Sequence, residues 1–302
     1  ADRIYLTPED LLDVKGLRIE AMYLGGTLEK LGVDLEVERI GKYKDAADTF
    51  TRKSMAEETR QVLNSLLDQL FADMVGSIAT ARKLDEAQVR ALIDQGPFLA
   101  EDARAGGLVD ELVYEDQFEE RVVKATKLEE YKAVSGSAFY RATSASGSRK
   151  NQVALLVAEG NIVRSAPESV WGSEVVLASN QFRQTAEQIA KNDDIKAVIV
   201  RVDSPGGDAF ASDEMLHALK VLRKKKPVVI SMSDTAASGG YYIALTGDPV
   251  LAYENTVTGS IGVIYGKVNL RKLYDKIGAQ KEIMTRGRFA AADSDYTPLD
   301  PA

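Results

Sequence analysis

The sequence has no cysteine and only one histidine, His217. The absence of thiols excludes a cysteine nucleophile, a disulfide framework and cysteine-based metal sites. A single histidine also excludes metal centres and catalytic mechanisms that need two imidazoles. We therefore expect a hydrolase built from this chain to use a base other than histidine.

Basic residues and long apolar runs are also scarce. Lysine and arginine number 38 against 46 acidic residues, and the net charge of −8 is the wrong sign for tight binding to nucleic acid. No stretch approaches the roughly 20 apolar residues of a membrane span, and the first residues do not resemble an export signal. With 45% apolar residues over 302 positions, we expect a soluble globular piece with one large or two medium cores.

The first half of the chain has a helical pattern. Residues 55–93 place apolar side chains three and four positions apart, which predicts two amphipathic helices. A short helix, a break at Gly106 and Gly107 and a brief strand should follow. Residues 134–150 are rich in serine, glycine and alanine without a period, which predicts a linker.

The second half alternates apolar runs rich in valine and isoleucine with segments of helical period. Helices are predicted at 180–191 and 208–226, and buried strands at 153–163, 196–203, 227–232 and 248–254. This alternation indicates an α/β domain. The basic run at 223–226 lies at a predicted helix end, where it complements the helix dipole, so we do not interpret it as a nucleic-acid site.

An internal repeat relates the two ends of the sequence. At an offset of 246 residues, the stretch from Gly247 aligns with the stretch from Ala1 without a gap, and glycines, lysines and apolar positions match. We predict a tandem duplication in which residues 1–133 are the C-terminal portion of a first repeat and 151–302 the N-terminal portion of a second. The piece would then come from a longer protein.

Three short motifs follow predicted strands in the second half. VDSPGG at 202–207 contains a Gly-Gly turn that leaves N–H groups free to hold an oxyanion, although such a turn can be purely structural. AASGGYYIA at 236–244 places a serine at a helix start among residues small enough for a substrate to approach, or simply for a helix to pack on a sheet. TGSIGV at 258–263 adds a second hydroxyl in what is otherwise an ordinary turn.

In this order and spacing the three motifs resemble the signal peptide peptidase A family in its two-domain bacterial form. The resemblance includes GLVDELV at 107–113 and IGKYKDAADTF at 40–50, and it covers essentially the whole chain. It implies a ClpP/crotonase-like α/β fold of repeated ββα units and a serine peptidase with a Ser-Lys dyad, without cofactor or metal. It also implies peptide substrates such as remnant signal peptides, a homo-oligomeric ring such as a tetramer, and a membrane anchor outside this sequence, with the catalytic domain on the extracytoplasmic side.

The family's functional residues fall on specific positions of this chain. The serine of the SGG motif is Ser238, the nucleophile, and the lysine of the Gly-x-x-Lys segment is Lys44, the general base, which the two-domain form takes from the first repeat. Ser260 resembles the residue whose hydroxyl positions the lysine amine. The oxyanion hole falls on the backbone of Gly206, Gly207 and Gly239.

The repeat supports a dyad divided between the two copies. Lys44 aligns with Ala290, so the second copy has no base of its own, and Ser260 aligns with Val14, so the first copy lacks the positioning hydroxyl. Without this pattern Lys44 would be interpreted as a solvated surface lysine. Its nearest rival, Lys42, is out of register with the motif.

A lysine can act as a base only when it is neutral. With an ordinary pKa near 10.4, roughly one lysine molecule in 2500 is neutral at pH 7. We therefore expect a domain interface to bury Lys44 beside a hydroxyl, with the carboxylate of Asp45 turned away, so that desolvation lowers the lysine pKa. The contact with Ser238 could form within one chain or between neighbouring chains.

Two other functions remain open at this point. A crotonase-like enzyme that acts on acyl-CoA would use paired N–H groups to stabilise an enolate. Ser238 with a distant lysine is not a usual set of catalytic residues for such an enzyme. An inactive oligomeric scaffold would keep the fold and bind peptides. A serine-directed fluorophosphonate or a peptide aldehyde separates the three, because only the peptidase forms a Ser238 adduct that requires Lys44.

Overall fold

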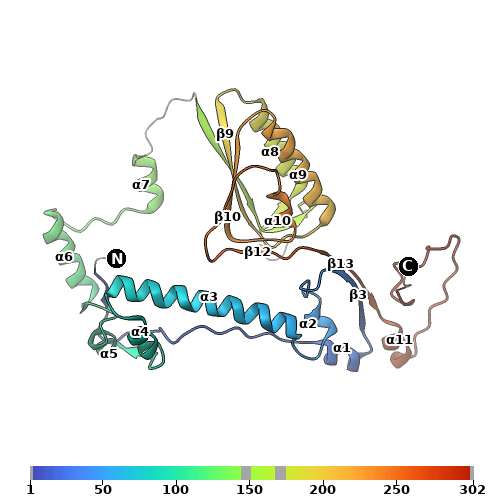
Figure 1. The fold of residues 1–302 in the computed structure, drawn as a ribbon, viewed down its shortest axis with the longest axis horizontal. Coiled ribbons are helices and arrows are strands. Elements are labelled where there is room, and N and C mark those ends of the chain that lie inside the picture. Colours follow the sequence, from blue (N-terminus) through green and yellow to red (C-terminus); the bar gives the residue numbers. More distant parts are fainter. Residues whose placement is uncertain (1–2, 144–150, 167–174, 300–302) are drawn as a thin grey trace. The chain divides into compact units, whose positions relative to one another are not determined.

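The computed structural model describes residues 3–143, 151–166 and 175–299. The chain forms two compact units (Figure 1). We call residues 1–20 and 61–147 the helical unit, and residues 21–60 and 148–302 the sheet unit. Helix α3 (Glu57–Arg82) begins in the sheet unit and continues in the helical unit.

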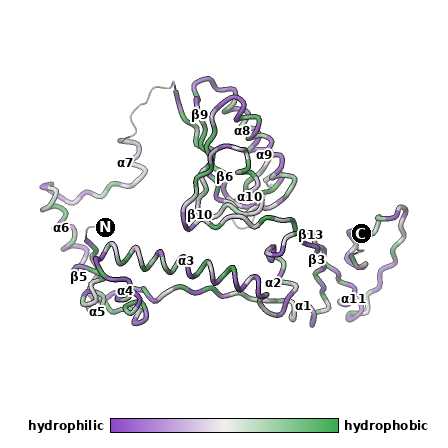
Figure 2. The backbone as a smooth tube through the Cα atoms, viewed as in Figure 1, coloured by the Kyte–Doolittle hydropathy of each residue, from purple (hydrophilic) through white to green (hydrophobic). Residues whose placement is uncertain are grey.

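The helical unit is built on the amphipathic pattern of its sequence, visible as alternating green and purple along α3 in Figure 2. The predicted helices in 55–93 are confirmed as α3 and α4, and α4 begins with a capping box between Asp85 and Gln88. Its core gathers residues such as Val75, Val89 and Phe98. Besides α3, its elements are β1 (Tyr5–Leu6), β2 (Leu11–Leu12), α4 (Glu86–Ile93), β4 (Phe98–Leu99), α5 (Ala100–Ala105), β5 (Glu111–Leu112), α6 (Glu115–Thr126) and α7 (Gly136–Thr143).

The expected linker at 134–150 contains a helix. Helix α7 covers most of its first half, and residues 144–150 lie outside the described residues. Ala138 and Ala142 stand four positions apart in this segment, and alanine is the best helix former, which explains why composition alone misleads here.

The sheet unit contains the second of the two aligned stretches and the part of the first that follows residue 20. From the first half it takes α1 (Gly25–Leu31), β3 (Asp34–Ile40) and α2 (Asp48–Thr51). The rest are β6 (Gln152–Glu159), β7 (Asn161–Val163), β8 (Val176–Ala178), α8 (Ser179–Lys191), β9 (Ile195–Ser204), α9 (Ala209–Arg223), β10 (Val228–Ala237), α10 (Gly239–Ile243), β11 (Val250–Leu251), β12 (Val257–Gly259), β13 (Val263–Asn269) and α11 (Arg271–Ile277).

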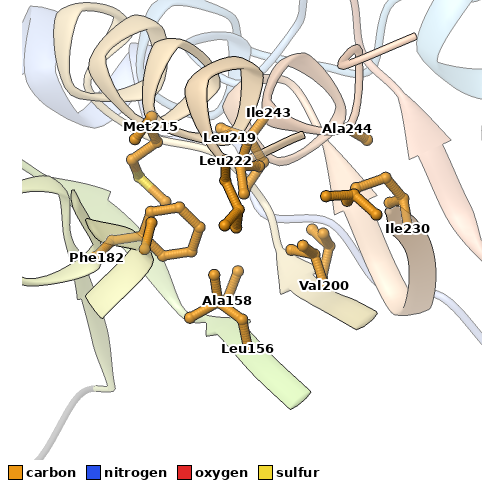
Figure 3. Close-up of a cluster of buried hydrophobic side chains, with 14 of the residues drawn as sticks. Leu156, Ala158, Phe182, Val200, Met215, Leu219, Leu222, Ile230, Ile243 and Ala244 are labelled. Atoms are coloured by element: carbon orange, nitrogen blue, oxygen red, sulfur yellow. The ribbon is translucent and has the colours of Figure 1, made fainter. Parts of the chain in front are cut away.

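A five-stranded parallel sheet organises this unit. Its order is β11-β10-β9-β6, and β12 pairs with the carboxyl end of β10. The pairing of β10 with β9 shifts register between Met232 and Ala236. Helices α8 and α9 pack on the sheet through Phe182, Met215 and Leu219, as Figure 3 shows. The predicted α/β architecture is confirmed, and the chemistry-bearing loops follow the carboxyl ends of β9, β10 and β12.

The strands are less buried than their apolar runs predict. On β6, Leu156 and Ala158 face the core, whereas Val153 and Leu155 are about three-fifths exposed. The expected strand at 248–254 shrinks to the two exposed residues of β11. A continuous apolar run is typical of a strand covered on both faces, but the core residues of β6, β9 and β10 alternate along each strand, so the described residues bury one face.

The repeat has a structural counterpart. Helices α1 and α11 are 246 residues apart at both ends, and each stops at a left-handed glycine, Gly32 or Gly278, whose N–H bonds the last carbonyls. The compact units divide the chain differently from the predicted repeats, because residues 21–60 belong with the second half. The assignment of the two repeats themselves stays a prediction.

Truncation of Leu219 should destabilise the sheet unit. This side chain on α9 is fully buried against the sheet, so Leu219→Ala removes apolar contacts and leaves a cavity, with an expected loss of about 2–5 kcal/mol in unfolding free energy. Val221, which is 39% exposed on the same helix, is the matched control, and Val221→Ala should change stability by about 0.5 kcal/mol or less. Urea denaturation followed by circular dichroism measures both, and equal losses would contradict this core.

Candidate active site

The antiparallel pair β3–β13 brings two distant turns together. Its register runs from Asp34 opposite Asn269 to Ile40 opposite Val263, and beyond that end lie the turn after β3 and the turn before β13. Their backbones touch: a Cβ on Gly41 would lie 2.8 Å from the carbonyl oxygen of Ile261, and one on Gly262 would collide with the carbonyl of Ile40. Both glycines have positive φ, so glycine is required for space and for conformation.

Lys44 ends the first of these turns and is buried, with 8% of its surface exposed. Its N–H donates to the carbonyl of Gly41 at 3.2 Å, which closes the turn. The guanidinium of Arg39 donates to the Lys44 carbonyl at 3.4 Å and is itself held by the buried carboxylate of Asp48 at 3.0 Å. The backbone of Lys44 is therefore fixed from both sides. Lys42, by contrast, is exposed and lies 3.8 Å from the carboxylate of Glu58.

Ser238 stands at the junction of β10 and α10 in a strained conformation. Its φ of 53° and ψ of −117° lie in a backbone region that residues other than glycine rarely adopt. Two backbone hydrogen bonds hold it there: its N–H donates to the carbonyl of Gly259 at 2.9 Å, and its carbonyl accepts from the N–H of Tyr242 at 2.8 Å. The neighbouring strand β12 and the first turn of α10 thus fix the serine from opposite sides.

The lysine amine meets the serine hydroxyl inside the sheet unit. Nζ of Lys44 lies 2.7 Å from Oγ of Ser238, 2.8 Å from the carbonyl oxygen of Ser260 and 3.1 Å from the Oγ of Ser260. All three oxygens are uncharged. A neutral amine that donates its two N–H groups to the two oxygens of Ser260 directs its lone pair at the hydroxyl of Ser238, which is the arrangement needed to accept a proton.

Burial lowers the pKa of Lys44, because desolvation disfavours the ammonium form, and the nearby carboxylate of Asp45 partly opposes this by raising the same pKa. Asp45 does not contact the amine directly. Its carboxylate instead accepts a hydrogen bond from the hydroxyl of Thr59, at 2.6 Å. The net effect of the site is thus to make the ammonium form of Lys44 less favourable than it is in an exposed lysine.

The Gly-Gly turn after β9 lies against Ser238. A Cβ on Gly206 would come within 2.5 Å of the Gly239 nitrogen and 2.8 Å of the Ser238 Cβ. The N–H groups of Gly207 and Gly239 donate to no acceptor within the described part of the chain, so both are free for an incoming oxyanion. The structure thus brings all six predicted site residues into one place.

The sequence motifs did not reveal the residues that hold this turn in shape. The buried hydroxyl of Ser204 donates to the carbonyl of Gly160 at 2.7 Å and accepts the N–H of Gly206 at 3.1 Å. Ile162 on β7 bridges the same loop through Gly206 and Asp208. Ser204 stands inside the VDSPGG motif, so its position was a signal. The contacts of Arg39 and Thr59 depend on tertiary structure, so no sequence motif pointed to these two residues.

The described ranges hold no group of three or more histidine or acidic residues arranged to bind a metal. Within the same ranges, no helix is long and apolar enough to cross a membrane.

Comparison with known proteins identifies the chain as a serine peptidase homologue. The family model for peptidase family S49 matches residues 1–129 and 220–302. The chain belongs to peptidase family S49, which confirms the resemblance seen in its motifs.

Two curated relatives match almost all of the chain. The chloroplastic serine protease SPPA of Arabidopsis thaliana is 37% identical over 99% of this chain and 45% of its own length. Protease 4 of Haemophilus influenzae is 29% identical over 99% of this chain and 50% of its own length. The chain therefore spans about half the length of these relatives. A solved structure of the 1510-N membrane-bound stomatin-specific protease is 26% identical, with a TM-score of 0.27, over 36% of this chain and 46% of that one.

Removal of the Ser260 hydroxyl should slow the reaction of Ser238 without abolishing it. The hydroxyl is one of two groups that orient the amine, and the Ser260 carbonyl remains, so the loss should be about 1–3 kcal/mol, or roughly 5- to 150-fold in rate. Ser260 has a φ of 50°, and Ser260→Gly therefore accompanies Ser260→Ala as a variant without backbone strain. Fluorophosphonate labelling rates measure both; a normal rate in the glycine variant would assign the defect to the backbone.

Proposed function

We propose that the chain supplies the active centre of a serine endopeptidase in which Ser238 is the nucleophile and Lys44 the general base. One observation carries this proposal: the Lys44 amine lies 2.7 Å from the Ser238 hydroxyl and is otherwise surrounded by uncharged oxygens. A buried lysine without a carboxylate partner is costly to a fold, and proton transfer gives it a use.

The reaction follows from this arrangement. Neutral Lys44 accepts the proton of Ser238 as its Oγ attacks the peptide carbonyl, and the N–H groups of Gly207 and Gly239 stabilise the oxyanion. The C–N bond then breaks, and the ammonium of Lys44 delivers its proton to the leaving amine. Water hydrolyses the resulting ester by the same proton transfers in reverse.

The two other candidate functions lack comparable support. Enolate chemistry on an acyl-CoA would use the oxyanion hole but would need neither Ser238 nor Lys44. A binding scaffold would have no reason to keep a serine at φ 53° beside a buried amine, because each feature destabilises the fold.

For the substrate we propose extended apolar peptides, such as remnant signal peptides. Exposed apolar residues adjoin two of the site residues in sequence: Tyr43 precedes Lys44 and Ile261 follows Ser260, with exposures of 50% and 73%. Ile40 and Val263, which are paired across β3 and β13, are also more than half exposed. Exposed apolar groups of this kind suit an apolar ligand. We further propose that the whole protein works at a membrane, on its extracytoplasmic side, through an anchor outside this sequence.

Loss of either dyad residue should abolish peptidase activity. Ser238→Ala removes the nucleophile and Lys44→Ala the base, and because the two act as one unit, the double variant should be no slower than either single variant. Cleavage of an apolar fluorogenic peptide and fluorophosphonate labelling provide the measurements.

Lys42→Ala is the matched control for the base, since it removes an exposed lysine from the same turn, and its activity should be unchanged. A fully active Lys44→Ala variant, or losses that add up in the double variant, would contradict the dyad.

We also propose that copies of the chain assemble into a ring. In the chain, β13 of one repeat pairs with β3 of the other. Their counterparts at the 246-residue offset, residues 17–23 and 280–286, belong to no helix or strand, are mostly exposed and are unpaired within the described residues. Pairing of 17–23 in one copy with 280–286 in the next repeats the internal contact between molecules. The two segments belong to different surfaces of the chain, so this contact joins copies head to tail. Such a head-to-tail contact closes into a ring when the rotation between neighbouring copies permits it.

The proposed pairing has a defined register, in which Ile19 lies opposite Met284 of the next copy. The chain has no cysteine, so Ile19→Cys and Met284→Cys introduce single thiols, and a mixture of the two variants should form an intermolecular disulfide on mild oxidation. Arg18→Cys mixed with Met284→Cys is the control, because a shift of one residue turns the thiol to the opposite face. Equal cross-linking of both mixtures, or a monomer in sedimentation, would contradict this assembly.

A further inference from the structure

Asp45 is the charged neighbour of Lys44 that forms no ion pair within the described residues. The other charges around this turn are paired: Arg39 and Arg52 with Asp48, Lys42 with Glu58, and Arg60 with Glu57. They come from the turn itself, from β3, from α2 and from the first turn of α3. From the side of β10 and β12, the amine meets the uncharged oxygens of Ser238 and Ser260.

An unpaired carboxylate beside an ammonium group is attracted to it. Contact between the two would stabilise the charged lysine, and an opposite charge in contact shifts a pKa by about 1–3 units. The catalytic proposal requires the reverse, a lysine that loses its proton readily. The Asp45 carboxylate must therefore be kept off the amine.

The hydroxyl of Thr59 is placed to do this. Thr59 lies in the first turn of α3 and donates to Oδ2 of Asp45 at 2.6 Å, a short hydrogen bond to a charged acceptor. The backbone of Asp45 is fixed as well, because its carbonyl accepts from the N–H of Asp48 at 2.8 Å. With the main chain and the carboxylate both held, Asp45 cannot swing towards Lys44 without losing a hydrogen bond.

We propose that Thr59 is a positioning residue for catalysis: its hydroxyl holds the Asp45 carboxylate away from the Lys44 amine and so keeps the lysine available as a base. The inference rests on the proposed function of Lys44. Thr59 touches neither substrate nor the reacting atoms and acts only through Asp45. The lowered pKa of Lys44, with Asp45 as its opposing influence, agrees with this role.

The test removes the hydroxyl and follows the titration of Lys44. In Thr59→Val the carboxylate is released and the pKa of Lys44 should rise by about one unit. Below both pKa values the neutral fraction, and with it the peptidase rate, then falls about 10-fold, whereas above the raised pKa the rates converge. Thr59→Ser keeps a hydroxyl and should restore the wild-type profile.

Asp45→Asn provides the second arm. Without the charge, the pKa of Lys44 should fall below its wild-type value, and Thr59→Val added to Asp45→Asn should cause no further shift. Thr51→Val is the matched control: the Thr51 hydroxyl, at the end of α2, donates to the backbone carbonyl of Ala47, so its loss should leave the profile unchanged.

Two readouts separate this inference from the proposed function. The ¹³Cε signal of Lys44, assigned by its loss in Lys44→Ala, reports the lysine pKa whether or not the chain is active, and the pH profile of peptide cleavage reports catalysis. A rise in the Lys44 pKa without a change in cleavage supports the hold of Thr59 on Asp45 and contradicts Lys44 as the base. A Thr59→Val variant that is slower by the same factor at every pH, with an unmoved signal, would show a merely structural residue and overturn the inference.

Discussion

The pairing of β3 with β13 is the constraint on which the candidate site depends. Seven residue pairs hold together segments more than 220 positions apart in sequence, and the turns at one end of this ribbon carry Lys44 and Ser260. The carbonyl of Gly259, just before Ser260, also holds the N–H of Ser238, so one short segment orients both partners of the proposed dyad. A slip of one residue along β3 would turn every side chain over and remove the amine from the serine.

Several features of the backbone and side chains around the β3–β13 pair each lower the stability of the fold. Ser238 and Ser260 both have positive φ values, five glycines around the site also have positive φ, and an amine is buried among neutral oxygens. Such features persist only where the surroundings hold them in place. Here α8, α9 and the parallel strands share one buried hydrophobic core, and most of the site lies in the loops that follow these strands.

Much of this arrangement was predictable because short-range signals carry it. The alternation of apolar runs with helical periods led to the α/β fold, and three short motifs carried the family resemblance that assigned the six site residues. Where the outcome depends on tertiary partners, the sequence misled or was silent. Helix α7 stands in an expected linker, and residues 21–60 join the second half because β3 finds its partner there. Thr59 could not be singled out, since its role arises only from the approach of α3 to the turn after Lys44.

The burial of Lys44 also links the stability of the site to pH. Its pKa is lowered in the folded chain, so the folded state binds this proton less tightly than the unfolded state does. Below the folded-state pKa, the charged amine lowers the free energy of unfolding by its full amount. This loss of stability declines as the pH rises above the folded-state pKa and vanishes near the ordinary pKa of 10.5. The neutral amine that the proposed proton transfer requires is thus also the form that costs the fold less, and each protonation of Lys44 in the proposed catalytic cycle puts the site briefly into its less stable state.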